Sequence, residues 1–222
     1  MANRFETNKY VLTVEGQTEK LYFSWLHSLL NAIPDKKYNV SIVCNVEQHP
    51  FTYAKRLNSR STPELIHVCD IEGQHHENIM KFHGILEELK KTKNQKGISC
   101  KLAYSNMTFE LWMILHKIDC NKCYSNRNQY LQVINSAFEE SFLSLNEYKS
   151  ELNFKRCLSK LSLDDVINAI RRANNINRRN KQNQTEEVQY CGYKYYVNNP
   201  SLTINEAVEK ILIECDVLNE KS

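Results

Sequence analysis

Residues 11–23, VLTVEGQTEKLYF, join two different patterns of side chains. The first half is a β-branched apolar run, which is typical of a buried strand. Glu15 and Gly16 follow directly, and from residue 18 to residue 33 the apolar side chains recur at helical spacing. The stretch therefore predicts a strand, a short turn that carries one acid, and a helix whose first turn carries a second acid, Glu19.

Three further runs resemble this first strand, and helical patterns separate them. The predicted strands cover residues 9–14, 37–44, 64–70 and 99–105. The predicted helices between them cover residues 18–33, 50–60 and 77–93. Strands that alternate with helices predict an α/β fold with a parallel sheet and flanking helices.

The second half of the chain has mostly helical periodicity. The predicted helices there cover residues 108–118, 127–142, 150–161, 163–179 and 203–218. Ser162 or Asp164 is the expected cap of the fourth, and Thr203 with Glu206 resembles a capping box. We therefore expect a core domain in residues 1–120 and a mainly helical C-terminal subdomain in residues 121–222.

The composition indicates a soluble globular protein. Hydrophobic residues make up 41% of the 222 residues, too many for a disordered chain. No apolar run approaches the roughly 20 residues that span a bilayer, and the first ten residues lack the apolar core of a signal peptide. We expect a cytoplasmic protein without a membrane partner, whose eight scattered cysteines are reduced.

Two pairs of acids follow predicted strands. Glu15 follows the first strand and Asp70 ends the third, and ligands bind at the carboxyl ends of parallel strands. Glu19 shares a helix side with Glu15, and Glu72 shares a face with Asp70 in extended backbone. Carboxylate oxygens are ligands that Mg²⁺ prefers, so these acids are candidate metal ligands. The alternative is ordinary helix-start and turn composition.

Three stretches, residues 11–23, 67–73 (HVCDIEG) and 104–119 (YSNMTFELWMILHKID), resemble the ordered motifs of the RloB-like family. This family is a branch of the topoisomerase-primase (Toprim) domain found in phage-defence loci, and related Toprim nucleases include those of the OLD family. The resemblance covers residues 10–119 and extends weakly to the C-terminus. It implies a Toprim-like fold.

The resemblance also implies roles for the acids. Glu15 matches the Glu that follows the first strand in Toprim nucleases, and Asp70 and Glu72 match their Asp-x-Asp. These three residues would hold Mg²⁺ or Mn²⁺ for phosphodiester cleavage, and Glu19 matches a second acid of OLD-type relatives. Glu72 departs from the usual Asp and moves its oxygens by one methylene, which leaves open whether a second ion binds.

Glu110 and His116 lie in the third matching stretch, where the resembling motif also has Glu and His. Glu110 is expected to ligate metal or orient a ligand, and His116 to contact phosphate or act as an acid or base. The alternative is a Glu that hydrogen-bonds a loop and a histidine packed in the core.

A group of cations in the second half has no intervening acid and lies on one predicted helix. Its members are Arg171, Arg172, Arg178, Arg179 and Lys181. Such a stripe predicts binding to a nucleic-acid backbone. The alternatives are a solvated helix face and a docking surface for an acidic partner. The tyrosines of residues 190–196 are candidates for base stacking or for packing in a β-like segment.

The leading hypothesis is a divalent-metal-dependent endonuclease that acts as the effector of an antiviral defence system (abortive infection). The predicted catalytic residues are Glu15, Glu19, Asp70, Glu72, Glu110 and His116. No phosphate-binding loop of the Gly-x4-Gly-Lys-Ser/Thr type is present, and the resemblance implies an ABC-type ATPase partner. The substrate, DNA or RNA, stays open, and a homodimer is reasonable. The alternative function is a non-catalytic Toprim-like module that binds nucleic acid or a partner.

Overall fold

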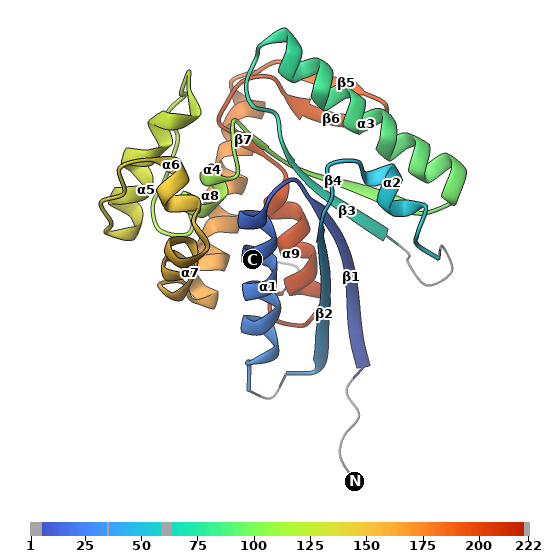
Figure 1. The fold of residues 1–222 in the computed structure, drawn as a ribbon, viewed down its shortest axis with the longest axis horizontal. Coiled ribbons are helices and arrows are strands. Elements are labelled where there is room, and N and C mark those ends of the chain that lie inside the picture. Colours follow the sequence, from blue (N-terminus) through green and yellow to red (C-terminus); the bar gives the residue numbers. More distant parts are fainter. Residues whose placement is uncertain (1–5, 35, 59–63, 220–222) are drawn as a thin grey trace.

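A five-stranded sheet forms the centre of the computed structural model, which describes residues 6–34, 36–58 and 64–219. The strand order is β2-β1-β3-β4-β7 (Figure 1). The strands are β1 (Glu6–Val14), β2 (Tyr38–Val46), β3 (Glu64–Asp70), β4 (Ser99–Asn106) and β7 (Ser201–Leu202). The first four are parallel and β7 is antiparallel to β4. The prediction of an α/β fold with a parallel sheet is confirmed.

The register of the sheet places two sequence-distant acids at one edge. Val14, the last residue of β1, pairs with Val68 of β3, two residues before Asp70. Because both strands run in the same direction, Glu15 and Asp70 leave the sheet side by side. The two strands are buried on both faces and so read as nearly continuous apolar runs.

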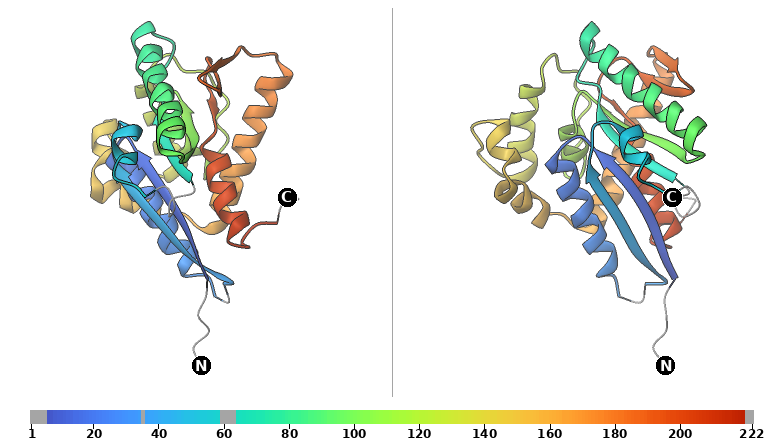
Figure 2. Two further views of the ribbon diagram at one scale, coloured as in Figure 1. Left: turned by 90° about the vertical axis from the view of Figure 1, so that its right-hand side faces the viewer. Right: turned by 45° about the vertical axis from the view of Figure 1, so that its right-hand side comes forward.

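Helices cover both faces of this sheet (Figure 2). α1 (Gln17–Asn31) and α9 (Ile204–Glu214) share a hydrophobic core with Leu12 and Val14 of β1. Val11 faces the other way, toward Ala54 of α2 (Pro50–Ala54), and α3 (His76–Lys96) packs on the same side. The alternation of side chains along β1 therefore divides the core between two helical layers.

The segment after β4 is mainly helical, as predicted. Its elements are α4 (Glu110–Leu115), the 3₁₀ turn η1 (Arg127–Gln129), α5 (Tyr130–Phe138), α6 (Leu145–Lys149), α7 (Glu151–Ser159) and α8 (Leu163–Gln182). Within the described ranges no helix is long and apolar enough to cross a membrane. None of the eight cysteines, all of which lie in the described ranges, is paired in a disulfide; their reduced state stays a prediction.

The C-terminal part of the chain returns to the central sheet. Leu202 of β7 pairs with Ser105 of β4, and residues of α8 and α9 share one hydrophobic core with residues of β1 and β3. A division at residue 120 therefore does not separate two hydrophobic cores.

The tyrosine-rich segment forms a hairpin of β5 (Glu187–Tyr190) and β6 (Tyr193–Tyr196). Its two-residue turn has positive φ at both Cys191 and Gly192, as hairpins with matching twist require. Tyr190 stacks on His83 of α3 with ring centroids 3.9 Å apart, and buried Tyr195 packs on Phe82. The β-like packing role predicted for this segment is confirmed for these two tyrosines.

Two predictions at helix ends are corrected. The helix predicted over residues 50–60 ends at Ala54, and residues 59 and 60 lie outside the described part of the chain. The Thr203 hydroxyl does not cap α9, because it donates to the Leu102 carbonyl and accepts from the Tyr104 N–H. The hydroxyl bonds β4 because backbone N–H and C=O groups of that strand would otherwise lack hydrogen-bond partners.

Ser162 rather than Asp164 caps α8. The Ser162 hydroxyl accepts from the Asp165 N–H, and the Asp165 carboxylate accepts from the Ser162 N–H at 2.8 Å. This is a reciprocal capping box.

Replacing Ser162 with Ala should lower the free energy of unfolding by about 1 kcal/mol, because the first turn of α8 loses a backbone partner. Urea unfolding followed by circular dichroism measures the change. Ser159→Ala is the control, since that exposed hydroxyl donates to the carbonyl of Arg156 in its own helix. Equal midpoints for Ser162→Ala and the parent protein would contradict the cap.

Candidate functional site

Glu15 and Asp70 meet where β1 and β3 end. The backbone N–H of Asp70 donates to Glu15 Oε2 at 3.1 Å. The other oxygen of this carboxylate, Oε1, is buried and has no hydrogen-bond partner within the described ranges. A buried carboxylate oxygen without a partner is costly, so this oxygen is positioned for a donor or a cation.

Glu19 joins these two acids from the first turn of α1. Its side chain is buried, and Oε2 accepts a hydrogen bond from the Thr18 hydroxyl at 2.9 Å. Gly16 makes this position possible, because a Cβ on Gly16 would lie 2.8 Å from Glu19 Oε2. The glycine is needed here for space, since its backbone is extended.

Glu110 is the fourth acid and begins α4. It is fully buried, and one of its oxygens accepts a hydrogen bond from the Thr108 hydroxyl. Its other oxygen lies 3.0 Å from the ammonium of Lys149, at the end of α6. We call Glu15, Glu19, Asp70 and Glu110 the acid cluster.

Negative charge on the acid cluster is unfavourable, because its carboxylates are buried and repel one another. Burial, followed by repulsion from Glu19, Glu15 and Glu110, raises the pKa of Asp70 well above its usual value. Burial also raises the pKa of Glu15 and of Glu19; Glu110 adds to the shift of Glu19. In the absence of a bound cation these acids therefore retain protons above the pH at which exposed carboxylates lose them.

Lys149 is a residue of the candidate site that the sequence analysis did not identify. Burial alone would lower the pKa of this lysine, but Glu110, Asp70 and Glu19 together raise it. The side chain is one-third exposed and joins the cluster from a five-residue helix that no strong periodicity predicted. Only the packing of α6 against the rest of the site could identify it.

Glu72 lies at the rim of the acid cluster. Its backbone is left-handed, with φ 59°, and its N–H donates to the Met107 carbonyl. Its carboxylate repels Glu15 but lies 3.8 Å from Arg127 and 4.0 Å from Lys81, toward solvent. Glu72 is therefore near the other acids while its own charge is partly balanced elsewhere.

His116 is the one predicted catalytic residue that lies in the core away from these acids. Its Nδ1 donates to the Trp112 carbonyl at 2.9 Å, and its Nε2 accepts from the Tyr22 hydroxyl at 3.2 Å. Burial lowers its pKa to about 4, so the ring is neutral near pH 7. With both nitrogens engaged, it has the packing role that the sequence left as the alternative.

The five predicted nucleic-acid cations are not equivalent in the fold. Arg172 donates to the carbonyls of Leu115 and His116 at 2.7 and 3.0 Å and is mostly buried. It caps the end of α4, so we correct its assignment as a nucleic-acid contact. Arg171 and Arg179 are exposed, whereas the other two cations line a groove.

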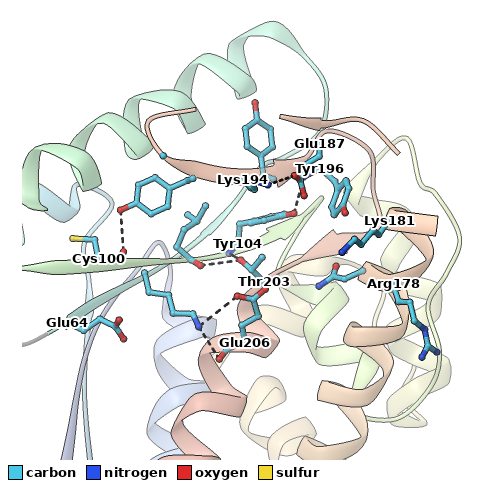
Figure 3. Close-up of a pocket in the computed structure, with 16 residues that line it drawn as sticks. Glu64, Cys100, Tyr104, Arg178, Lys181, Glu187, Lys194, Tyr196, Thr203 and Glu206 are labelled. Atoms are coloured by element: carbon cyan, nitrogen blue, oxygen red, sulfur yellow. Dashed lines mark hydrogen bonds and ion pairs between the residues drawn. The ribbon is translucent and has the colours of Figure 1, made fainter. Parts of the chain in front are cut away.

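This groove of about 730 Å³ lies between α8, β4 and the β5–β6 hairpin, and in Figure 3 Lys181 points toward Tyr196. Its lining includes residues of both charges, some of which form ion pairs. Lys101 pairs with Glu206 at 3.8 Å and Lys194 with Glu187 at 3.1 Å. The groove includes no member of the acid cluster, so the predicted basic surface and the predicted metal site are separate features.

The acid cluster fits a divalent cation in its chemistry. Hard oxygen donors, surplus negative charge and the unpartnered Glu15 Oε1 suit Mg²⁺ or Mn²⁺. In the described part of the chain, however, no group of three or more histidine, cysteine, aspartate or glutamate side chains is arranged to hold a metal ion. Binding would therefore require these side chains to rotate.

Comparison with known proteins gives one positive result. A family model described as RloB-like protein matches residues 10–211. No curated protein and no solved structure gives a match.

Asp70→Asn should make the metal-free protein more stable at pH 7, by about 1 kcal/mol, because it removes a repelled charge. The raised pKa values mean that the folded state binds more protons, so the acids' contribution to stability is greatest below about pH 4 and is lost as pH rises. Thermal melting of the parent protein and of Asp70→Asn in EDTA, from pH 7 down to about pH 4, measures the difference in stability. A difference that does not shrink toward low pH would contradict it.

Lys149→Met should destabilise the protein by about 2 kcal/mol, because it leaves Glu110 buried without its cation. The loss is below that of a fully buried pair because Lys149 is partly exposed. The control is Lys155→Met, which breaks an exposed pair with Glu151 and should change little. Urea unfolding measures both, and adding Glu110→Gln to Lys149→Met should recover much of the loss.

Proposed function

The chain belongs to the RloB-like protein family, and from this membership and the buried acid cluster we propose that it is a divalent-metal-dependent endonuclease. It would hydrolyse phosphodiester bonds of DNA or RNA. The observation that carries the proposal is the convergence of four carboxylates on one end of the sheet. Lys149 is the only cation of the described residues that is ion-paired with a member of this cluster.

Charge explains why this arrangement suits a metal site. Folding brings together four acids that repel one another, at a cost in stability that a structural role would not require. A divalent cation would reverse that cost and would bind best where the acids are already positioned. Perturbed acids clustered in one place are typical of functional sites.

Glu15 and Asp70 are the proposed main ligands, with Glu72 at the rim. A bound Mg²⁺ or Mn²⁺ would act as a Lewis acid and stabilise negative charge on the phosphate. Glu19 and Glu110 are held by Thr18, Thr108 and Lys149, and so would orient the ligands. His116 takes no part in this proposal.

The wider role rests on the sequence motifs. We propose a Toprim-like nuclease, related to the OLD-type enzymes, that acts in the cytoplasm as the effector of an antiviral defence system. An ABC-type ATPase would supply the nucleotide hydrolysis for which this sequence has no phosphate-binding loop. The homodimer stays a prediction.

A non-catalytic binding module is the second candidate. Glu72 favours it, because this residue replaces the usual Asp and directs its carboxylate toward Arg127 and Lys81. In that case nucleic acid or the ATPase would bind without need of a metal.

Glu15→Gln should lower metal-dependent cleavage at least about 100-fold while the protein stays folded, because the main ligand loses its charge. The assay uses labelled DNA and RNA with Mg²⁺ or Mn²⁺, with and without the ATPase encoded beside the protein. Glu151→Gln, at an exposed site on α7, is the matched control.

A second readout is the melting temperature. Mn²⁺ should raise it in the parent protein and in Glu151→Gln but not in Glu15→Gln. Full cleavage by Glu15→Gln would overturn the site assignment. Salt-sensitive binding without cleavage in any combination would favour the binding module.

A further inference from the structure

A second cavity, of about 620 Å³, opens beside the acid cluster. Glu72 lies on its wall and also repels Glu15, so the cavity adjoins the proposed cutting site. One wall is the loop after β3, and the other is the segment between α4 and α5 that carries Tyr124 and Gln129. Met107, from the link between β4 and α4, forms part of its apolar surface.

The chemistry of this cavity differs from that of the acid cluster. Among the described residues that line it, Glu72 is the one acid and none is a lysine or an arginine. An aromatic ring, a thioether and several amide groups line one space. Such a lining suits a flat heteroaromatic ring with donors and acceptors on its edge, whereas a phosphate would meet no lysine or arginine among the described lining residues.

Neighbouring residues hold both the backbone and the ring of Tyr124. The side-chain amide of Asn199 forms two hydrogen bonds with its backbone: the Tyr124 N–H donates to Oδ1 at 2.8 Å, and Nδ2 donates to the Tyr124 carbonyl at 2.9 Å. Its ring packs on buried Tyr130 with centroids 4.7 Å apart. The exposed ammonium of Lys122 lies 5.5 Å from the ring centre, where a base would take its place.

Gln129 supplies a polar edge. Its Oε1 accepts from the N–H groups of Ser125 and Asn126, which fixes the amide, and among the described residues its Nε2 has no acceptor. Arg127 pairs with Glu72 on the cavity wall, with its guanidinium 3.8 Å from the carboxylate and its side chain more than half exposed. It is therefore placed to contact a phosphate between a base in the cavity and the acid cluster.

We infer that this cavity binds one unpaired nucleobase of the nucleic acid, next to the phosphate that lies at the acid cluster. A base can enter only if it is not stacked and paired in a duplex, so the substrate class is a single strand or a loop. The inference rests on the proposed function, because it takes the acid cluster as the place of cleavage. Binding itself needs no metal.

The test measures binding of short fluorescent DNA and RNA single strands to the full chain in EDTA, which prevents cleavage. A set of strands carries one abasic site that moves along the sequence. For the parent protein, one abasic position should weaken binding roughly 10-fold. Tyr124→Leu should bind the intact strand more weakly by the same factor, and the abasic site at that position should then have no further effect on its affinity. Tyr124→Phe should behave like the parent.

Gln129→Glu provides a second variant that preserves the fold. Its oxygens can still accept from Ser125 and Asn126, but the cavity loses a donor and gains a charge. Gln182→Glu makes the same change at the exposed end of α8. Only Gln129→Glu should weaken binding and the abasic effect.

Two results would overturn the inference. One is a blunt duplex that binds as tightly as the single strand, and the other is Tyr124→Leu weakening all strands equally, abasic ones included. The nuclease proposal is tested separately by cleavage with Mg²⁺. If an abasic site weakens binding but no strand is cleaved, the base-binding inference holds and the nuclease proposal fails. If strands are cleaved but no abasic site weakens binding, the nuclease proposal holds and the base-binding inference fails.

Discussion

The parallel pairing of β1 with β3 is the constraint on which the rest of the site depends. It brings the ends of two strands together, and the Asp70 N–H then binds the Glu15 carboxylate directly. Backbone hydrogen bonds along both strands set this distance. The backbone positions of the two acids therefore cannot move apart unless the pairing of the strands is broken.

Elements that are distant in the sequence complete the site around this pair. α1 contributes Glu19 because Gly16 leaves room for its carboxylate, and α4 contributes Glu110 because Thr108 fixes it. Lys149 then compensates one charge of the four. The large apolar core beneath, which extends from β1 to α9, supplies the stability that tolerates this repulsion.

Two cavities of different chemistry are formed by the described residues. The cavity of Tyr124 and Gln129 is lined mostly by neutral polar and apolar residues and includes Glu72, whereas the groove of Lys181 has residues of both charges and lies at β4. The cations near Glu72 are Arg127 and Lys81, neither of which belongs to the run on α8. A polyanion bound next to the acid cluster would thus contact Arg127 and Lys81 rather than the cations of residues 171–181.

The sequence by itself determined the strands, most of the helices and the acids at the strand ends. Apolar runs and helical spacing are local properties, so β1, β2, β3 and β4 lie where they were predicted. The capping box of Ser162 is equally local. The family motifs indicated Glu15, Glu19, Asp70 and Glu110, which the fold gathers into one cluster.

Only the tertiary structure decided the roles that depend on distant partners. Arg172 resembles its neighbours in sequence but caps α4, and His116 satisfies both nitrogens in the core. Thr203 bonds the edge of β4 instead of its own helix, and Lys149 reaches Glu110 from a helix without a sequence signal. The physical reason is that a side chain's partner, burial and charge environment are set by residues far away in the chain, which no local pattern records.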